Sequence, residues 1–165
     1  MTILLDPVTL ELDLGSLKTG SNIGEFEIDC AEVDWDIPEA VPASPKGLLR
    51  LDVNYREKSV VCRGSFNAEF RIPCARCLEP ATFSVSEDIF AAWTADADKA
   101  DESVRPFPGG RHLGIFDAVR EAIILSIPGK PLCREDCRGL CHVCGANLNR
   151  ETCAHSGPAE TGKAR

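Results

Sequence analysis

Residues 131–155 read PLCREDCRGLCHVCGANLNRETCAH, and the five cysteines of this stretch decide how the rest of the chain is organised. Tetrahedral zinc sites take four nitrogen or sulfur ligands, usually as two closely spaced pairs. Cys141 and Cys144, with a glycine directly after them, have the form of a zinc knuckle, whose backbone N–H groups can turn toward the thiolates. Cys153 and His155 supply a second pair. The sequence therefore predicts one metal site from these four residues.

Cys133 and Cys137 form a further pair with no partners of their own inside the stretch. Cys74 and Cys77, in the tetrapeptide Cys-Ala-Arg-Cys, are the other closely spaced pair of the chain. We expect these four residues to bind a second metal ion that ties the tail to the middle of the chain. The competing arrangement groups the first four cysteines of the stretch into one local site. Sulfur–sulfur distances near ~3.7 Å between the two distant pairs would favour the long-range site, because tetrahedral thiolate ligands require that separation.

Length and composition indicate one domain with a real core and a small appendage, since the chain has 165 residues and is 44% hydrophobic. No apolar run of about 18 residues occurs, and the first residues have no basic start, so we expect neither a membrane span nor a secretory signal. The nine cysteines are therefore expected in a reducing compartment, the bacterial cytoplasm, where metal binding is favoured over disulfides.

The formal net charge of −8 is unevenly distributed. Residues 130–165 hold six basic and four acidic residues and carry +2, which leaves −10 on residues 1–129. Seven thiolates with two divalent ions would bring the whole chain to −11. An acidic chain of this kind binds nucleic acid poorly without specific contacts, so any RNA contact is expected on the tail.

Alternating apolar and polar residues predict two long half-buried antiparallel strands over 49–55 and 60–72 and a third over 81–93. Cys74 and Cys77 then lie at the tip of a hairpin. Shorter alternations predict strands at 8–14 and 26–30, with a turn-rich loop between them and a surface linker over 38–47. We expect a mainly β (α+β) fold, in which one antiparallel sheet is covered by a long helix and braced by a C-terminal zinc-binding segment.

An apolar face repeated at helical spacing predicts that covering helix over 115–127, ended by Pro128-Gly129. We accordingly expect three parts, which are a β domain with its helix over 1–129, a Cys-rich zinc-binding segment over 130–155, and a disordered tail over 156–165.

Three passages together resemble the YceD family of bacterial and plastid proteins: CARCLEP at the hairpin tip, FDAVREAIILSIP in the helix, and PLCREDCRGLCHVCGANLN after it. The order and spacing of all three agree, and the resemblance covers about residues 49–155. The family is known for the accumulation of large-subunit ribosomal RNA. The resemblance therefore implies a ribosome-biogenesis factor, whose partner is large-subunit (23S) ribosomal RNA, its precursor or a large-subunit ribosomal protein.

Two residue groups have alternative interpretations. Cys74 and Cys77 could be a redox-active pair, but such pairs usually open a helix, whereas this one joins two strands. The arginines beside the cysteines either compensate the charge of the thiolates or contact phosphate groups of RNA or another partner, and one arginine can do both; they are Arg76, Arg134, Arg138 and Arg150.

We predict a protein that is not an enzyme. Both metal sites would be closed by four protein ligands, whereas a catalytic zinc keeps an open position, and no nucleophile–base or phosphate-binding motif occurs. The prediction is a non-catalytic zinc-binding factor with about two zinc ions per chain, acting in large-subunit assembly. The alternative is an acidic adaptor or chaperone that holds a basic ribosomal protein without contacting RNA. A zinc-dependent hydrolase or nuclease that acts on ribosomal RNA precursors is the third class considered.

Overall fold

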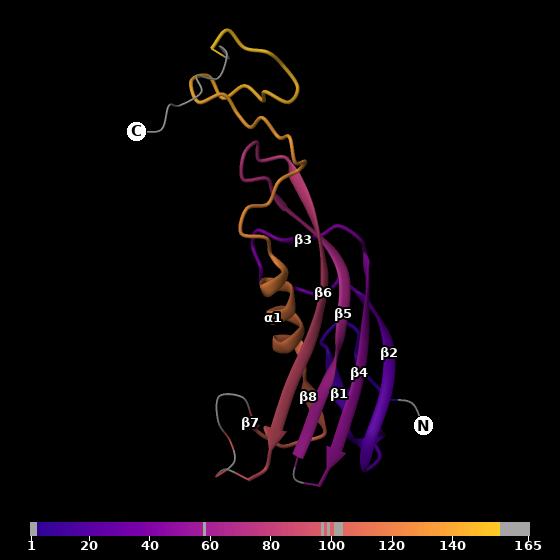
Figure 1. Ribbon diagram of the computed structural model, residues 1–165. Helices are drawn as coiled ribbons and strands as arrows, with labels where there is room; N and C mark the ends of the chain where they lie inside the picture. Colours follow the sequence, from indigo (N-terminus) through magenta and orange to yellow (C-terminus); the bar gives the residue numbers. More distant parts are fainter. Residues whose placement is uncertain (1–2, 58, 97, 99, 101–103, 156–165) are drawn as a thin grey trace.

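The computed structural model describes residues 3–57, 59–96, 98, 100 and 104–155. Its elements, in chain order, are β1 (Glu11–Asp13), the 3-10 helix η1 (Leu14–Ser16), β2 (Gly20–Asp29), β3 (Val41–Pro42), β4 (Lys46–Arg56), β5 (Ser59–Pro73), β6 (Pro80–Thr94), β7 (Arg105–Pro106), β8 (His112–Gly114) and α1 (Phe116–Ser126). The fold is thus mainly β, with one α-helix among the described residues (Figure 1).

The main sheet has the order β2-β4-β5-β6-β7, and β3 pairs with part of β5. Its long strands are antiparallel, and the predicted pairs around 49–55, 60–72 and 81–93 are confirmed as β4, β5 and β6. The β5–β6 pairing continues to Pro73↔Pro80, past the last β4 pair at Leu48↔Asn67. The end of this hairpin therefore projects beyond β4, with the two-residue β3 beside it at Phe70 and Arg71.

The core lies between one face of the sheet and α1, which packs mainly on β6. Apolar residues alternate into it from each strand, and Trp35 stacks on Phe116 of the helix at 6.0 Å between ring centroids. The predicted helix over 115–127 is confirmed to within one residue at each end, and Asp117 occupies its first turn, where a carboxylate suits the helix dipole. Cys62 of β5 is buried in this core.

The N-terminal predictions are corrected in three places. The strand expected over 8–14 is only Glu11–Asp13, because the Asp6 carboxylate accepts the backbone N–H groups of Val8 and Thr9 and folds the preceding residues into a turn. The expected loop after it is largely strand, since β2 begins at Gly20 and pairs with β4. The expected linker over 38–47 contains β3 and a buried Ala40.

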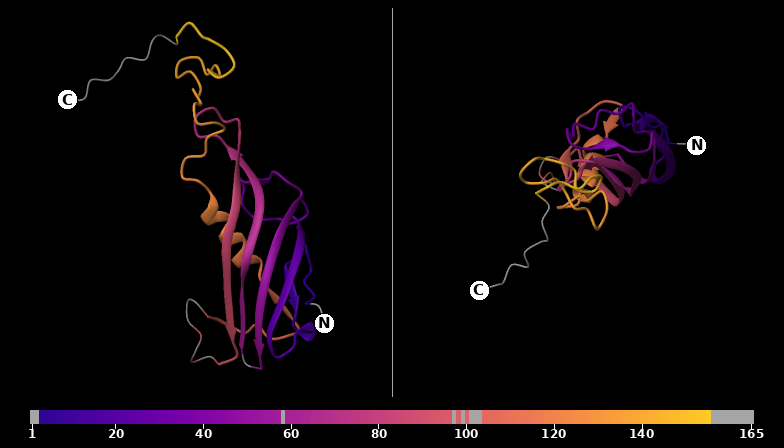
Figure 2. Two further views of the ribbon diagram at one scale, coloured as in Figure 1. Left: turned by 45° about the vertical axis from the view of Figure 1, so that its right-hand side comes forward. Right: turned by 90° about the horizontal axis from the view of Figure 1, so that it is seen from above.

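The Cys-rich segment extends the molecule at the projecting end of the hairpin, as the left-hand view shows (Figure 2). The chain leaves α1, runs to the tip of the β5–β6 hairpin and continues beyond it (Figure 1). No helix among the described residues is long and apolar enough to cross a membrane. Residues 156–165, for which we expected disorder, lie outside the described residues.

Candidate metal centres

The hairpin tip, residues 74–79, is a compact turn that carries its cysteines inward. The Cys74 N–H donates to the Glu79 carbonyl at 2.8 Å, and the Leu78 N–H donates to the Cys74 carbonyl at 3.0 Å. Leu78 adopts φ 63°, a left-handed conformation that lets the chain reverse. The side chains of Cys74 and Cys77 are buried as a result.

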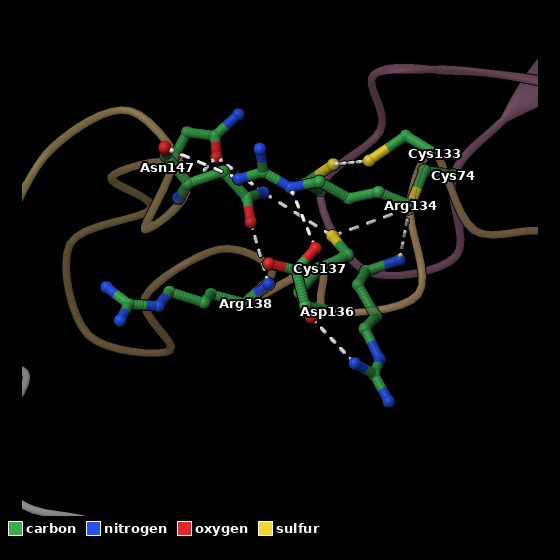
Figure 3. Close-up of polar contacts among 10 residues, drawn as sticks. Cys74, Cys133, Arg134, Asp136, Cys137, Arg138 and Asn147 are labelled. Carbon is green, nitrogen blue, oxygen red and sulfur yellow. Dashed lines mark hydrogen bonds and ion pairs between the residues drawn. The ribbon is translucent and has the colours of Figure 1, made fainter.

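The chain that follows α1 returns to this tip. The Ala75 N–H donates to the Pro131 carbonyl at 2.8 Å, which holds the returning segment against the turn. The Sγ atoms of Cys77 and Cys133 lie 3.5 Å apart, and those of Cys74 and Cys137 lie 3.8 Å apart. All four sulfur atoms lie within 4.8 Å of one another. We call this group the tip cluster; part of it is drawn in Figure 3.

These distances decide between the two groupings that the sequence leaves open. Tetrahedral thiolate ligands about 2.3 Å from a zinc ion stand roughly 3.7 Å apart. The measured separations are 3.5 and 3.8 Å, between cysteines 56 and 63 residues apart in sequence. The structure therefore brings together the long-range set, and the local grouping of the first four tail cysteines is not formed.

A second group, the knuckle cluster, consists of Cys141, Cys144, Cys153 and His155, whose candidate ligand atoms also lie within 4.8 Å of one another. The turn at its start is closed by the Gly145 N–H, which donates to the Cys141 carbonyl at 2.9 Å. Cys141 is buried, but Cys144 and His155 are exposed. The knuckle cluster therefore lies closer to solvent than the tip cluster.

Burial and hydrogen bonding act oppositely on the thiols of the tip cluster. Desolvation raises the pKa of Cys74, but backbone N–H donors, that of Arg76 foremost, outweigh it and lower this pKa to about 6. Desolvation and the neighbouring thiols raise the pKa of Cys133 to about 12. Such divergence is expected where close thiols cannot all ionise together. A divalent cation would allow every sulfur to ionise, because it replaces the protons with positive charge.

The knuckle cluster repeats this pattern. The backbone N–H groups of Cys144 and Val143 lower the pKa of Cys141 to about 6, despite burial. The pKa of Cys144 is raised, because the neighbouring thiols Cys141 and Cys153 together with burial outweigh a hydrogen bond from the Ala146 N–H. Both clusters therefore combine ligand atoms at metal-ligand spacing with N–H donors that stabilise thiolate, and the residues present fit a thiophilic ion.

The two clusters are joined by a network that the sequence pattern does not reveal. The Leu140 N–H donates to the Arg76 carbonyl at 3.0 Å, and Gly139 (φ 78°) lies so close that a Cβ there would meet the same oxygen at 3.0 Å. Arg150 and Asn147 both donate to the carboxylate of Glu79, at 2.8 and 3.3 Å. The segment that carries the knuckle cluster is thereby docked on the hairpin tip.

Asn149 is a second contributor that sequence reasoning missed. Its Nδ2 donates to the Cys137 sulfur at 3.4 Å, and its Oδ1 accepts the Arg138 backbone N–H at 2.7 Å. It lowers the pKa of Cys137 against the effect of burial. The only signal in the sequence is its place in the run Asn-Leu-Asn-Arg, which does not identify the sulfur it contacts.

Three of the four arginines singled out from the sequence contact oxygen atoms with their side chains. Arg76 donates to the Cys137 carbonyl at 2.6 Å, and Arg150 pairs with Glu79. Arg134 lies 3.5 Å from the Asp136 carboxylate and donates to the Asn149 carbonyl at 3.4 Å. The fourth, Arg138, points away from the sulfur atoms (Figure 3), and its guanidinium makes no hydrogen bond or ion pair with a described residue.

The family described as "Large ribosomal RNA subunit accumulation protein YceD" has a model that matches residues 62–164, which is more than half of the chain. The chain belongs to the YceD family. The match includes the β5–β6 hairpin from residue 62 onward, α1 and all eight residues of the two clusters. The YceD description names an accumulation protein and no class of enzyme.

Curated relatives are similar at moderate identity. A chloroplastic YCED homolog 1 of Zea mays, named a large ribosomal RNA subunit accumulation protein, is 28% identical over 174 residues, covering 86% of this chain and 59% of the relative. An uncharacterised protein of Mycobacterium tuberculosis is 29% identical over 119 residues, covering 68% of this chain and 58% of the relative. The chain thus spans less than two thirds of the length of these relatives. No solved structure matches it.

Proposed function

We propose that this YceD-family chain is a non-catalytic zinc-binding factor of ribosome biogenesis that supports the accumulation of 23S ribosomal RNA. The observation that carries the proposal is the pair of four-ligand clusters inside the region matched by the family. Zinc is the ion that best suits four sulfur ligands, or three sulfurs and one imidazole, in tetrahedral arrangement. We place this role in the bacterial cytoplasm, where thiols stay reduced.

The proposed role of the metal is structural. Each cluster offers four protein ligands, so a bound zinc would have no open position for substrate or water. The tip cluster would cross-link the hairpin to the segment after α1, and the knuckle cluster would order residues 141–155. Together with the Glu79 network, they would make the projecting end of the molecule a rigid platform.

This platform is our proposed contact surface for large-subunit ribosomal RNA or its precursor. Residues 1–129 carry −10, which disfavours RNA on the sheet. Arg138 is the leading candidate for a phosphate contact, since its guanidinium has no partner among the described residues. Arg76, Arg134 and Arg150 are further candidates that already hold internal partners and could add phosphate as a second acceptor.

The proposal is tested by complementation in the host that encodes the chain. Cells without the gene should show a lowered ratio of 23S to 16S ribosomal RNA, which the wild-type chain restores and a Cys74→Ser/Cys77→Ser chain does not. Cys62→Ala is the matched control, because it removes a cysteine that lies outside both clusters. An unchanged RNA ratio in the deleted strain, or full rescue by the double variant at equal protein level, would contradict the proposal.

The acidic adaptor remains a second candidate because of two charge observations. The chain carries −8, and three of its four candidate arginines are held by internal oxygen atoms. A basic ribosomal protein that stays bound after ribonuclease treatment would favour the adaptor. Ultraviolet cross-links between 23S ribosomal RNA and residues 134–150 would favour direct RNA contact.

A further inference from the structure

One edge of β6 is open along most of its length. β5 pairs with β6 on one side, from Pro73↔Pro80 to Ser59↔Thr94. On the other side β7 pairs only with Trp93 and Thr94. In the part of the chain that the structure describes, no strand pairs with this second edge between Pro80 and Ala92.

The backbone groups that face the open edge follow from the pairing. The Phe107 N–H donates to the Thr94 carbonyl at 2.8 Å, so Thr94 faces the β7 side. The β5–β6 register continues without a bulge, and every second residue of a strand directs its backbone groups to the same side. Phe90 and Asp88 therefore present N–H and C=O groups to the open edge, whereas the carbonyl of Ala92 is used by the parallel β6–β7 pair at Trp93↔Arg105.

The helix α1 lies alongside this edge (Figure 1). We call the hollow between them the groove. A cavity of about 360 Å³ lies between residues 88–92 of β6 and the helix stripe Ala118, Glu121, Ala122 and Leu125. Ala118 and Ala122 are buried and contribute small side chains to the lining of this cavity, whereas Leu125 is 72% exposed. A helix of eleven residues is about 16 Å long, which matches an extended segment of roughly five residues.

The charge of the groove selects a basic ligand. The carboxylates of Asp88 and Glu121 line it, and neither forms an ion pair with a described residue. Arg105 also lines it but is paired with Asp117 at 3.1 Å. Arg63 lies on the exposed face of the sheet, with its guanidinium 5.7 Å from the ring centroid of Phe90. Two carboxylates with no ion pair to a described residue therefore flank the open backbone edge of β6.

We propose that this groove binds an extended, lysine- or arginine-containing segment of a partner protein, which adds to β6 as a further strand. An open strand edge beside a helix provides backbone hydrogen bonds for affinity and pockets for alternate side chains for specificity. The strand β7 already pairs with this edge of β6 at Trp93 and Thr94, so the added segment must end before these residues. The site lies on α1 and β6, away from both cysteine clusters, and does not depend on metal or RNA.

The test is an NMR titration of the full metal-loaded chain with a synthetic nine-residue peptide of alternating lysine and valine. We expect amide shifts centred on residues 88–92, and slowed hydrogen exchange of the Asp88 and Phe90 amides. A peptide of alternating lysine and proline has the same charge but lacks the N–H groups of a strand, and it should bind at least about tenfold more weakly.

Charge-reversal variants distinguish binding to the groove from non-specific attraction of the basic peptide to the acidic chain. The variant Asp88→Lys/Glu121→Lys should weaken binding about tenfold, because two exposed charge pairs are lost. The control Glu11→Lys/Glu32→Lys makes the same change of net charge at exposed positions outside the groove and should leave affinity within about twofold. Equal weakening by both variants, equal binding of the proline peptide, or no saturable binding would overturn the proposal. So would a single-stranded RNA that shifts residues 88–92 when the peptide does not.

Discussion

Removing the two tip cysteines should destabilise the whole β domain and not only the turn that carries them. The variant Cys74→Ser/Cys77→Ser should lose the metal cross-link that we propose between the hairpin and the segment after α1. The tip cluster brings together residues up to 63 positions apart. By the chain-entropy relation, a cross-link that closes a loop of this length raises the free energy of unfolding by about 4 kcal/mol. A typical domain is stable by about 5–15 kcal/mol, so the loss is a large share of the total.

The knuckle cluster provides the matched comparison. Its cysteines lie within residues 141–153, so the loop that they close is short and contains no part of the sheet or of α1. Cys153→Ser should therefore leave the free energy of unfolding of the β domain unchanged to about 1 kcal/mol, even though one metal ion is lost.

The assay is urea unfolding of metal-loaded protein followed by tryptophan fluorescence. Trp35 and Trp93 are both buried in the main core, so the signal reports the β domain and not the cysteine clusters. We expect a decrease of about 4 kcal/mol for the tip variant and no change for Cys153→Ser. The reasoning is refuted if the tip variant unfolds within about 1 kcal/mol of the wild type, or if both variants lose the same amount.

Three further changes test separate parts of the fold. Gly64→Ala should lower the free energy of unfolding by about 3 kcal/mol or more, since its Cβ would lie 1.9 Å from the Arg50 carbonyl oxygen. The control Gly114→Ala meets no atom within 4 Å and should be tolerated, as thermal melts of both variants would show. Burial raises the pKa of Cys62 to about 12 from an ordinary 9.0, so only the unfolded thiol ionises as pH rises above 9. Between pH 8 and about pH 10.5, the free energy of unfolding from urea titrations should therefore fall by about 2 kcal/mol more in the wild type than in Cys62→Ala. Glu79→Gln removes an ion pair of the docked knuckle segment and should change global stability by less than about 1 kcal/mol, while limited proteolysis within residues 138–155 becomes faster.

The parts of the fold that could be predicted are those specified by local pattern. The strands β4, β5 and β6 alternate apolar and polar residues over most of their length, and α1 has an apolar face followed by Pro128. The bounds of the short β1 could not be predicted from the sequence. The residues before it alternate apolar and polar side chains as a strand does, but hydrogen bonds to the Asp6 carboxylate fold them into a turn.

The grouping of the cysteines followed from spacing, because few closely spaced pairs were available. The residues that support them did not follow. Asn149 and Glu79 act through contacts set by the path of an irregular chain, so no periodic signal marks them. The groove beside β6 could not be predicted from the sequence either, because it depends on where β7 ends and on how α1 packs, both of which are tertiary properties.

The measurement that tests the central claim most directly is the metal content of the chain and of its single-cluster variants. Native mass spectrometry of reduced protein, purified without chelator, should find about two zinc ions per chain. It should find one ion in Cys74→Ser/Cys77→Ser and one in Cys153→Ser, because the two clusters share no ligand. One ion or none in the wild type, or loss of both ions from the Cys153→Ser chain, would contradict two independent four-ligand sites.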